Sequence, residues 1–281
     1  MAGERFDFHL HTAFSDGARS PQEALDAARK AGLAGISFTD HDTADAYAGL
    51  MADPGDGPRI LPGIEVSASR DGVEMHILGY FPGGIPEGLQ NLVDRLLTER
   101  MDRIQDGVNR LGEKGIALSW AEVLAEAGGR VVSRGHLAQV LVKKHYIPHI
   151  YAAFPGLLGP ETVRPPGVDA REVVREILRL GGIPIWAHPI VDHVGPFLEG
   201  LVEAGLVGVE AYTPRRRPAE MKRLLTGIAG RSLILTGGSD WHGQEKEPLG
   251  RFTVGDREVG DFLREIGWSA LSGGRPMEPK T

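Results

Sequence analysis

The stretch R-F-D-F-H-L-H-T-A-F-S-D-G-A-R-S-P-Q-E, residues 5–23, decides how the chain begins to fold. Its first part, residues 5–10, alternates in polarity and then meets a turn, which predicts a β-strand. Ser20-Pro21-Gln22-Glu23 follows, a capping box with proline at the first helical position. We therefore expect a helix from Pro21 to about Ala31, ended by Gly32, and hence a strand–helix unit at the start.

The remaining chain continues this alternation, with one helical interruption. Short apolar runs at residues 35–39, 60–66 and 75–80 predict buried strands. In residues 85–167 the apolar residues recur at helical spacing, and the segment ends in a stretch rich in Pro and Gly, so we expect an inserted, mainly helical subdomain. Strands and helices then alternate again after residue 168. This order predicts an α/β fold with a parallel sheet, either a barrel or a doubly wound sheet.

Composition limits the class of function. The 281 residues are 41% hydrophobic and 25% charged, as in a soluble globular protein. The sequence shows no transmembrane-length apolar run and no signal peptide, so we expect a cytoplasmic protein without a membrane partner. The net charge of -7 gives no general attraction to long DNA. Because the chain has no cysteine, any metal ion must be held by His, Asp and Glu.

Histidines and acids collect where the predicted strands end. His9 and His11 lie at the end of the first strand, and their i, i+2 spacing points both side chains to the same face. The other members of this set are Asp16, His41, Glu65, His76, His188, Asp240 and His242. A single strand histidine is more often structural, but so many at carboxyl ends of strands, where α/β barrels build their active sites, predict a metal site. Imidazole and carboxylate ligands suit Zn, Mn or Fe.

These residues lie in motifs that resemble a known family, the PHP (polymerase and histidinol phosphatase) metal-dependent phosphoesterases. The matching motifs are His9-Leu10-His11 with Ser15-Asp16-Gly17, Thr39-Asp40-His41-Asp42-Thr43, Gly63-Ile64-Glu65, His76-Ile77-Leu78-Gly79-Tyr80, Ala187-His188-Pro189, Gly208-Val209-Glu210 and Gly238-Ser239-Asp240-Trp241-His242-Gly243. They span nearly the whole chain in order. The S-D-G and T-D-H-D-T forms and the inserted Ser133-Arg134-Gly135-His136 are most similar to the branch that acts on nucleotides. Members of that branch remove phosphate from nucleoside 3',5'-bisphosphates or trim short RNA from the 5' end.

The resemblance implies a distorted (β/α)7 TIM-like barrel made by residues 1–84 and 168–281, with residues 85–167 covering the site. It also implies three divalent ions, Mn, Zn or Fe, which activate a hydroxide for attack on the phosphate. The first ion would be held by His9, His11, Glu65 and Asp240, the second by Glu65, His76 and His188, and the third by Asp16, His41 and His242. The expected catalytic residues are Asp16, His41, Glu65, His188 and Asp240. Arg134 and His136 are expected to bind a second phosphate or the nucleotide, the alternative being an ordinary helix N-terminus.

Several alternatives stay open at this point. Residues 190–193 after the Ala-His-Pro motif, and the linker at 161–166, differ from the nucleotide branch, so a histidinol-phosphate or sugar phosphatase and a cyclic-phosphate phosphodiesterase are alternatives. A non-catalytic metal-binding PHP module is an alternative of another class, disfavoured because the ligand set is complete. The expected partner is a small phosphorylated substrate, a nucleotide or short RNA, with no obligate protein partner.

Overall fold

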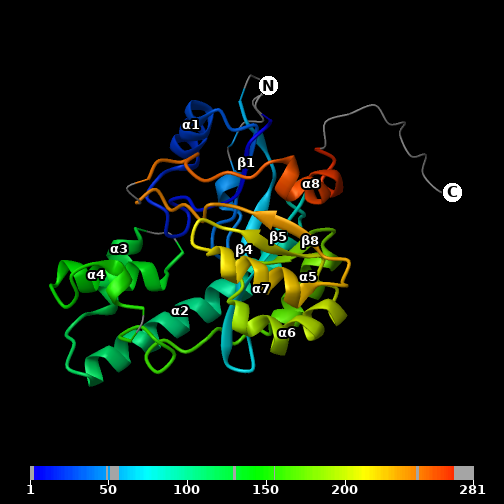
Figure 1. Ribbon diagram of the computed structural model, residues 1–281. Helices are drawn as coiled ribbons and strands as arrows, with labels where there is room; N and C mark the ends of the chain where they lie inside the picture. Colours follow the sequence, from blue (N-terminus) through cyan, green and yellow to red (C-terminus); the bar gives the residue numbers. More distant parts are fainter. Residues whose placement is uncertain are drawn as a thin grey trace, which may run out of the picture.

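The strands of the protein form two sheets. The computed structural model describes residues 3–48, 50, 57–128, 131–154, 156–244 and 247–268 (Figure 1). The first sheet has the order β1 (Phe6–Leu10), β2 (Gly35–Phe38) and β3 (Arg59–Ile60), and the second β4 (Gly63–Arg70), β5 (Val73–Tyr80), β6 (Ile183–Trp186), β7 (Gly208–Tyr212) and β8 (Ile234–Gly237). Neighbouring strands are parallel except for the pairs β4–β5 and β5–β6. A mixed α/β fold with parallel strands is therefore confirmed, and the antiparallel pairing of β5 with both of its neighbours is the departure from the expected parallel sheet.

Two local features explain how the observed strands differ from the expected ones. The run at 60–66, expected as one strand, divides into β3 and β4 because Pro62 lacks the N–H that would continue the ladder. At the end of β4, Asp71 and Gly72 take left-handed backbone angles, with φ of 50° and 78°. A two-residue turn of this kind matches the twist of a hairpin, so β5 runs straight back along β4.

The two sheets meet at their edges through isolated bridges. Leu10 pairs with Trp241, and His41 pairs with Glu65, both in parallel, while Phe6 pairs with Val254. Among the described residues these bridges do not merge the sheets into one closed ladder. The structure thus shows two sheets joined at their edges, and the closed barrel expected from the motifs is not seen as such.

Helices cover the outer faces of the sheets. They are α1 (Pro21–Ala31), η1 (Asp45–Tyr47), α5 (Ala170–Arg179), α6 (Val191–Glu203), α7 (Pro218–Ile228) and α8 (Asp256–Glu265). The predicted start and end of α1 are confirmed, because the Ser20 hydroxyl accepts a hydrogen bond from the Glu23 N–H and Gly32 is left-handed with φ of 67°. On the opposite side of β1 from His9, Phe8 packs edge-on against Phe262 of α8, with the two ring centres 5.0 Å apart. Apolar packing therefore leaves one face of β1 for polar residues.

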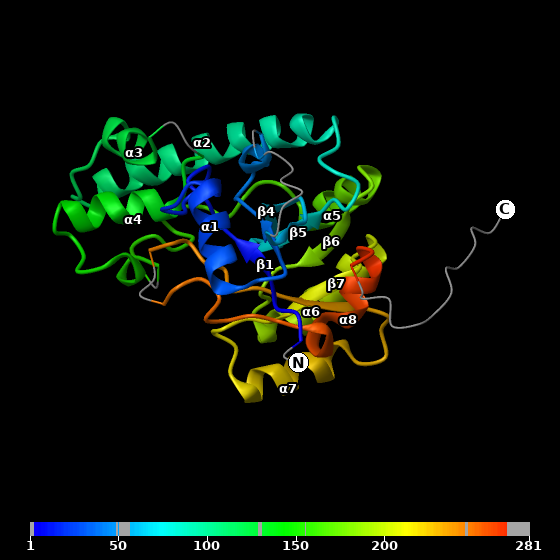
Figure 2. The ribbon, with the colours of Figure 1, turned by 90° about the horizontal axis from the view of Figure 1, so that it is seen from above.

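The helical segment between β5 and β6 forms a lobe with its own apolar core. Its elements are α2 (Leu89–Glu113), α3 (Trp120–Ala127), α4 (Arg134–Lys143) and η2 (Ile150–Ala152). Residues such as Ile104, Val123 and Leu137 pack inside the lobe, whereas the start of α2 packs against the second sheet. Both views place α3 and α4 at one end of the molecule, away from α5 to α8 (Figures 1 and 2). The limits 85 and 167 stay predictions. None of the helices described is long and apolar enough to cross a bilayer.

Candidate metal centre

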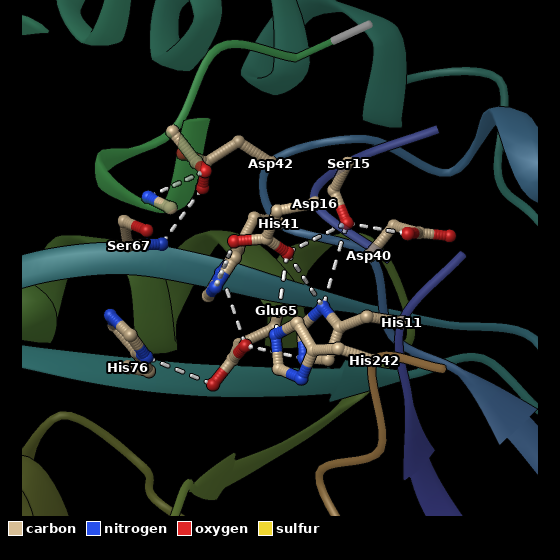
Figure 3. Close-up of polar contacts among 12 residues, drawn as sticks. His11, Ser15, Asp16, Asp40, His41, Asp42, Glu65, Ser67, His76 and His242 are labelled. Atoms are coloured by element: carbon tan, nitrogen blue, oxygen red, sulfur yellow. Dashed lines mark hydrogen bonds and ion pairs between the residues drawn. The ribbon is translucent and has the colours of Figure 1, made fainter. Parts of the chain in front are cut away.

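The nine predicted ligands come together at one place, where the two sheets meet. Figure 3 shows His11, Asp16, His41, Glu65, His76 and His242 of this set. They come from β1 and the turn after it (His9, His11, Asp16), the turn after β2 (His41), β4 (Glu65), β5 (His76), and the turns after β6 and β8 (His188, Asp240, His242). Overlapping groups of these residues have donor atoms that all lie within 4.8 Å of one another. Isolated structural histidines would not converge in this way, so the shared location is the first sign of a site.

Glu65 lies at the centre of the cluster and is almost completely buried. Its Oε1 is 2.9 Å from Nδ1 of His76 and 2.9 Å from Nε2 of His188. Its Oε2 is 3.0 Å from Nδ1 of His41 and 3.2 Å from Nε2 of His11. Burial alone would raise the pKa of Glu65, but the surrounding imidazoles outweigh it and hold the pKa well below its usual range. The carboxylate is therefore ionised, and its two oxygens point at different histidines.

Two further carboxylates complete the cluster on the other side. Asp240 Oδ1 is 3.2 Å from Nε2 of His11, and Asp16 Oδ1 is 3.4 Å from Nε2 of His242. Nδ1 of His242 is 2.9 Å from the backbone oxygen of Asp240, which directs Nε2 of the same ring toward Asp16. Asp240 has a left-handed backbone, with φ of 54°, so the turn after β8 is bent to bring its carboxylate to the histidines.

Outer carboxylates orient two of the histidines. Glu210 of β7 is fully buried, with Oε1 at 3.0 Å from Nδ1 of His9 and Oε2 accepting the backbone N–H of His188 at 2.8 Å. Glu74 of β5 lies 3.5 Å from Nε2 of His76, on the side of the ring away from Glu65. A carboxylate on the outer nitrogen of a histidine fixes the ring and makes its inner nitrogen a better metal ligand.

The donor set fits divalent cations. Burial alone would lower the pKa of His11, but Asp240 and Glu65 outweigh it and raise this pKa to about 10. In the same way Glu65 is the main group that raises the pKa of His76 to about 9. Oε2 of Glu65 and Nδ1 of His41 are buried and face each other at 3.0 Å, yet neither atom makes a hydrogen bond within the described part of the chain. Cations in place of protons would satisfy these atoms, and a set of imidazoles and carboxylates without sulfur suits Mn, Zn or Fe.

Two buried aspartates hold the turns that carry the ligands. Asp40 accepts hydrogen bonds from the backbone N–H and the hydroxyl of Thr12, each at 2.7 Å, and from the hydroxyl of Ser15 at 2.5 Å. Asp42 accepts the N–H of Ser67 at 2.7 Å and a hydrogen bond from Nε of Arg100 at 2.7 Å (Figure 3). The second contact ties α2 of the helical lobe directly to the sheet beside the cluster.

A cavity of about 310 Å³ opens onto the cluster and carries the cationic side chains. Arg134, the first residue of α4, lines it and pairs with Glu74 at 2.9 Å. His136 does not line the cavity: it is buried, and its Nδ1 accepts the backbone N–H of Ser133 at 3.1 Å as part of the cap of α4. Arg134 therefore lies where a substrate anion could reach it, while His136 occupies the helix-cap position that the sequence left open as an alternative.

Sequence reasoning missed several charged residues of the site. Glu210 belongs to a motif that was recognised, but nothing local shows that its carboxylate reaches His9, 201 residues away. Glu74 could have been found, because it is two residues before His76 and so lies on the same face of β5. Arg100 and Arg103 also line the cavity. Their sequence surroundings, a long amphipathic helix, are typical of exposed charge and carry no signal.

The comparisons agree with this geometry. The model of the PHP domain matches residues 7–154. A phosphoribosyl 1,2-cyclic phosphate 1,2-diphosphodiesterase from Eggerthella lenta is 33% identical over 261 residues, which covers 85% of this chain and 94% of that protein. A 3',5'-nucleoside bisphosphate phosphatase from Chromobacterium violaceum is 26% identical, over 84% of this chain and 86% of that one. The solved structure of a candidate metal-dependent phosphoesterase from Bifidobacterium adolescentis superimposes with a TM-score of 0.76 at 28% identity, covering 93% of this chain and 94% of that one.

The chain therefore belongs to the PHP domain family. The resemblance inferred from its motifs is confirmed, and so is the class of enzyme, a phosphoesterase whose site has clusters of His, Asp and Glu able to hold metal ions.

Proposed function

We propose that this chain hydrolyses a phosphate ester of a small nucleotide substrate with the help of bound divalent ions. The observation that carries the proposal is the position of Glu65, which contacts imidazoles through both oxygens at the floor of a cavity lined by arginines. A shared carboxylate is a means of holding two cations close together, and guanidinium groups match phosphate oxygens. The activities of the two relatives, on a cyclic phosphate and on a nucleoside bisphosphate, support a small phosphorylated substrate, and the second supports a nucleotide.

We propose three ions, Mn, Zn or Fe, and the ligand sets already expected from the motifs. Two groups of the structure support that division: His9, His11 and Asp240 in one, and Asp16, His41 and His242 together with His11 in another. Glu65, with Oε1 at 2.9 Å from a ring nitrogen of both His76 and His188, would bind the remaining ion together with these two histidines. When bound, such ions polarise the phosphate and make a water molecule a stronger nucleophile at neutral pH.

The protein's own groups would position the substrate. Asp16, His41, Glu65, His188 and Asp240, the proposed catalytic residues, all line the cavity and so face the space where a phosphate would sit, whereas His9 and His11 do not line it. Arg134 enters from the helical lobe, and we keep it as the anchor for the part of the substrate remote from the reacting phosphate. His136 would act on substrate only through the start of α4, since its ring is held in the cap.

The two sheets also fit the proposal of one distorted barrel. The bridges Leu10–Trp241 and His41–Glu65 join their edges beside the metal cluster, where a barrel would close. In that arrangement most ligands would lie at the carboxyl ends of strands, as in other barrel enzymes.

The first test is the release of phosphate by the Mn-loaded protein from adenosine 3',5'-bisphosphate, with AMP and histidinol phosphate in parallel. We expect release from the bisphosphate to exceed release from the other two. Activity on none of these, and none on cyclic phosphates, would contradict the proposal.

A cyclic-phosphate phosphodiesterase is the second candidate, and the relative with this activity, 33% identical over 85% of this chain, favours it. Phosphoribosyl 1,2-cyclic phosphate carries a monophosphate beside its cyclic phosphate, so Arg134, which lines the cavity, could anchor the monophosphate. Opening of phosphoribosyl 1,2-cyclic phosphate is followed by phosphorus NMR, because ring opening releases no inorganic phosphate.

The role of Arg134 is tested by Arg134→Ala, with Arg217→Ala as the matched control. Arg217 is 79% exposed, pairs with Glu220 and does not line the cavity. We expect the Arg134 variant to raise KM about 10-fold or more with little change in kcat, because it removes a contact made equally in the ground state and the transition state. A pure loss of kcat would place Arg134 at the reacting phosphate instead.

A further inference from the structure

Two aromatic side chains of the helical lobe face the cavity and stay exposed. Tyr151 of η2 is 57% exposed and Phe154 is 38% exposed, and both line the cavity that contains the metal cluster. They are three residues apart: Tyr151 lies in η2, and Phe154 directly follows Ala153, the residue that caps this element. Ala153 and Leu158 of the same segment are fully buried in the core of the lobe. The segment is thus anchored by other residues, and the packing of the lobe does not account for the two rings.

Contacts along the cavity give its groups an order. Glu65 of the cluster contacts His76, and His76 lies 3.5 Å from Glu74. Glu74 pairs with Arg134 at 2.9 Å, and the guanidinium of Arg134 lies 5.9 Å from the ring centre of Phe154. The cavity therefore passes from the metal ligands, through a carboxylate and a guanidinium, to an aromatic wall.

A nucleotide has its chemical groups in the same order. Its phosphate suits the cluster, the hydroxyl groups of its sugar can donate to a carboxylate such as Glu74, and its base is flat and apolar on both faces. Exposed aromatic rings bind bases by stacking, which removes apolar surface from water on both partners. A substrate that ends at the sugar would leave the rings of Tyr151 and Phe154 in contact with solvent.

From this order we infer that Tyr151 and Phe154 form a nucleobase-binding subsite, which selects substrates that carry a base over sugar phosphates without one. The inference rests on the proposed function, since it takes the phosphate to bind at the cluster. The inference distinguishes between the activities of the two relatives, because a nucleoside bisphosphate carries a base and a phosphoribosyl cyclic phosphate does not.

The experiment compares equilibrium binding of AMP and of ribose 5-phosphate to the Mn-loaded, full-length protein by isothermal titration calorimetry. The two ligands share the sugar and the 5'-phosphate, so their difference reports the base. We expect AMP to bind about 10-fold more tightly or better. Tyr151→Ala and the double variant with Phe154→Ala should reduce this preference to about 2-fold or less, whereas Tyr151→Phe should keep it because the ring remains.

The matched control is Tyr146→Ala. Tyr146 is also an exposed aromatic residue of the lobe, at 41%, but its hydroxyl accepts the N–H of Ala117 and it does not line the cavity. This variant should keep the preference for AMP.

Each contrary result has its own meaning. Equal binding of AMP and ribose 5-phosphate by the wild type overturns the subsite and leaves the proposed function standing. A preference that survives in the double variant overturns it as well, because the base then binds elsewhere. Loss of the preference in Tyr151→Phe would overturn stacking, because the base would then be held by a hydrogen bond to the Tyr151 hydroxyl. Binding of neither ligand, together with no hydrolysis of any phosphate ester, would overturn the proposed function itself.

Discussion

Replacing Glu210 with glutamine tests how the cluster is held in shape. The Glu210 carboxylate is fully buried and makes two contacts, at 3.0 Å to Nδ1 of His9 and at 2.8 Å to the backbone N–H of His188. When each nitrogen donates, both contacts need an acceptor, and glutamine offers only one. The substitution keeps the size of the side chain, so it opens no cavity in the core.

The expected loss follows from the contact that glutamine cannot make. A hydrogen bond to a buried charged group contributes about 1.5–3 kcal/mol, which corresponds to about 10- to 150-fold in an equilibrium constant. Loss of an outer carboxylate typically weakens metal binding by about 10- to 100-fold. His188 makes the effect local, because its backbone has a φ of 25° and the bond from its N–H to Glu210 helps to hold that conformation. We therefore expect Glu210→Gln to bind Mn about 10- to 100-fold more weakly.

The assay is a titration of the metal-free protein with Mn in competition with a chelating dye, combined with metal analysis of the loaded protein. Glu220→Gln is the control, since Glu220 pairs with Arg217 on α7 and does not touch the cluster. An unchanged Kd for Mn in Glu210→Gln would refute the reasoning. If saturating Mn fails to restore the full number of ions, Glu210 is itself a ligand with His9 and His188, an arrangement that the positions of their donor atoms also permit.

Three further outcomes follow from the same contacts. Asp240→Asn should lower turnover about 100-fold or more while the circular dichroism spectrum of the folded protein stays that of the wild type, because it removes a charged metal donor at the rim of the cavity and opens no space in the core. Turnover close to wild type would remove Asp240 from the proposed metal set. Arg100→Met leaves Asp42 buried without its cation and should lower the free energy of unfolding in urea by about 3–5 kcal/mol. Addition of Asp42→Asn should recover part of this loss, and simple additivity would contradict the pairing. Because the folded pKa of His11 is raised to about 10, above its ordinary 6.5, its contribution to stability is complete below pH 6.5 and is lost as the pH rises toward 10. The melting temperature of the metal-free protein should therefore fall over this range more steeply than that of the Mn-loaded protein, and parallel curves would speak against the raised pKa.

The sequence was most informative where the cause of a structure is local. The Ser20–Glu23 capping box and the left-handed Gly32 determine both ends of α1 within a dozen residues, so the helix was predictable. The convergence of the histidines and acids on one place was predictable for a different reason. His and acid residues at the ends of several strands must share one region once the strands lie side by side, whatever the details of the sheet.

The direction of β5 and the outer carboxylates depend on contacts that no local pattern shows. A strand in the middle of a sheet has the same apolar pattern whether its neighbours run with it or against it, so the reversal at Asp71 and Gly72 was missed. The partner of His9 lies 201 residues further along the chain, and only the position of β7 in the folded sheet brings Glu210 to it. Arg134 and His136 show a similar limit. Both belong to the first turn of α4, yet Arg134 lines the cavity while the ring of His136 is held in the helix cap.

The site divides its tasks between two parts of the molecule. All nine proposed ligands come from the strands or from the turns that follow them, whereas Arg134, Tyr151 and Phe154 come from the helical lobe, which has a separate apolar core. The lobe contacts the cluster through a few ion pairs, of which Arg100–Asp42 and Arg134–Glu74 are the shortest. Changes in the lobe can therefore alter which phosphate ester is bound while the geometry of the metal ligands stays the same. On this proposal, relatives that match nearly the same share of this chain, but act on a cyclic phosphate in one case and a bisphosphate in another, are expected to differ in the lobe.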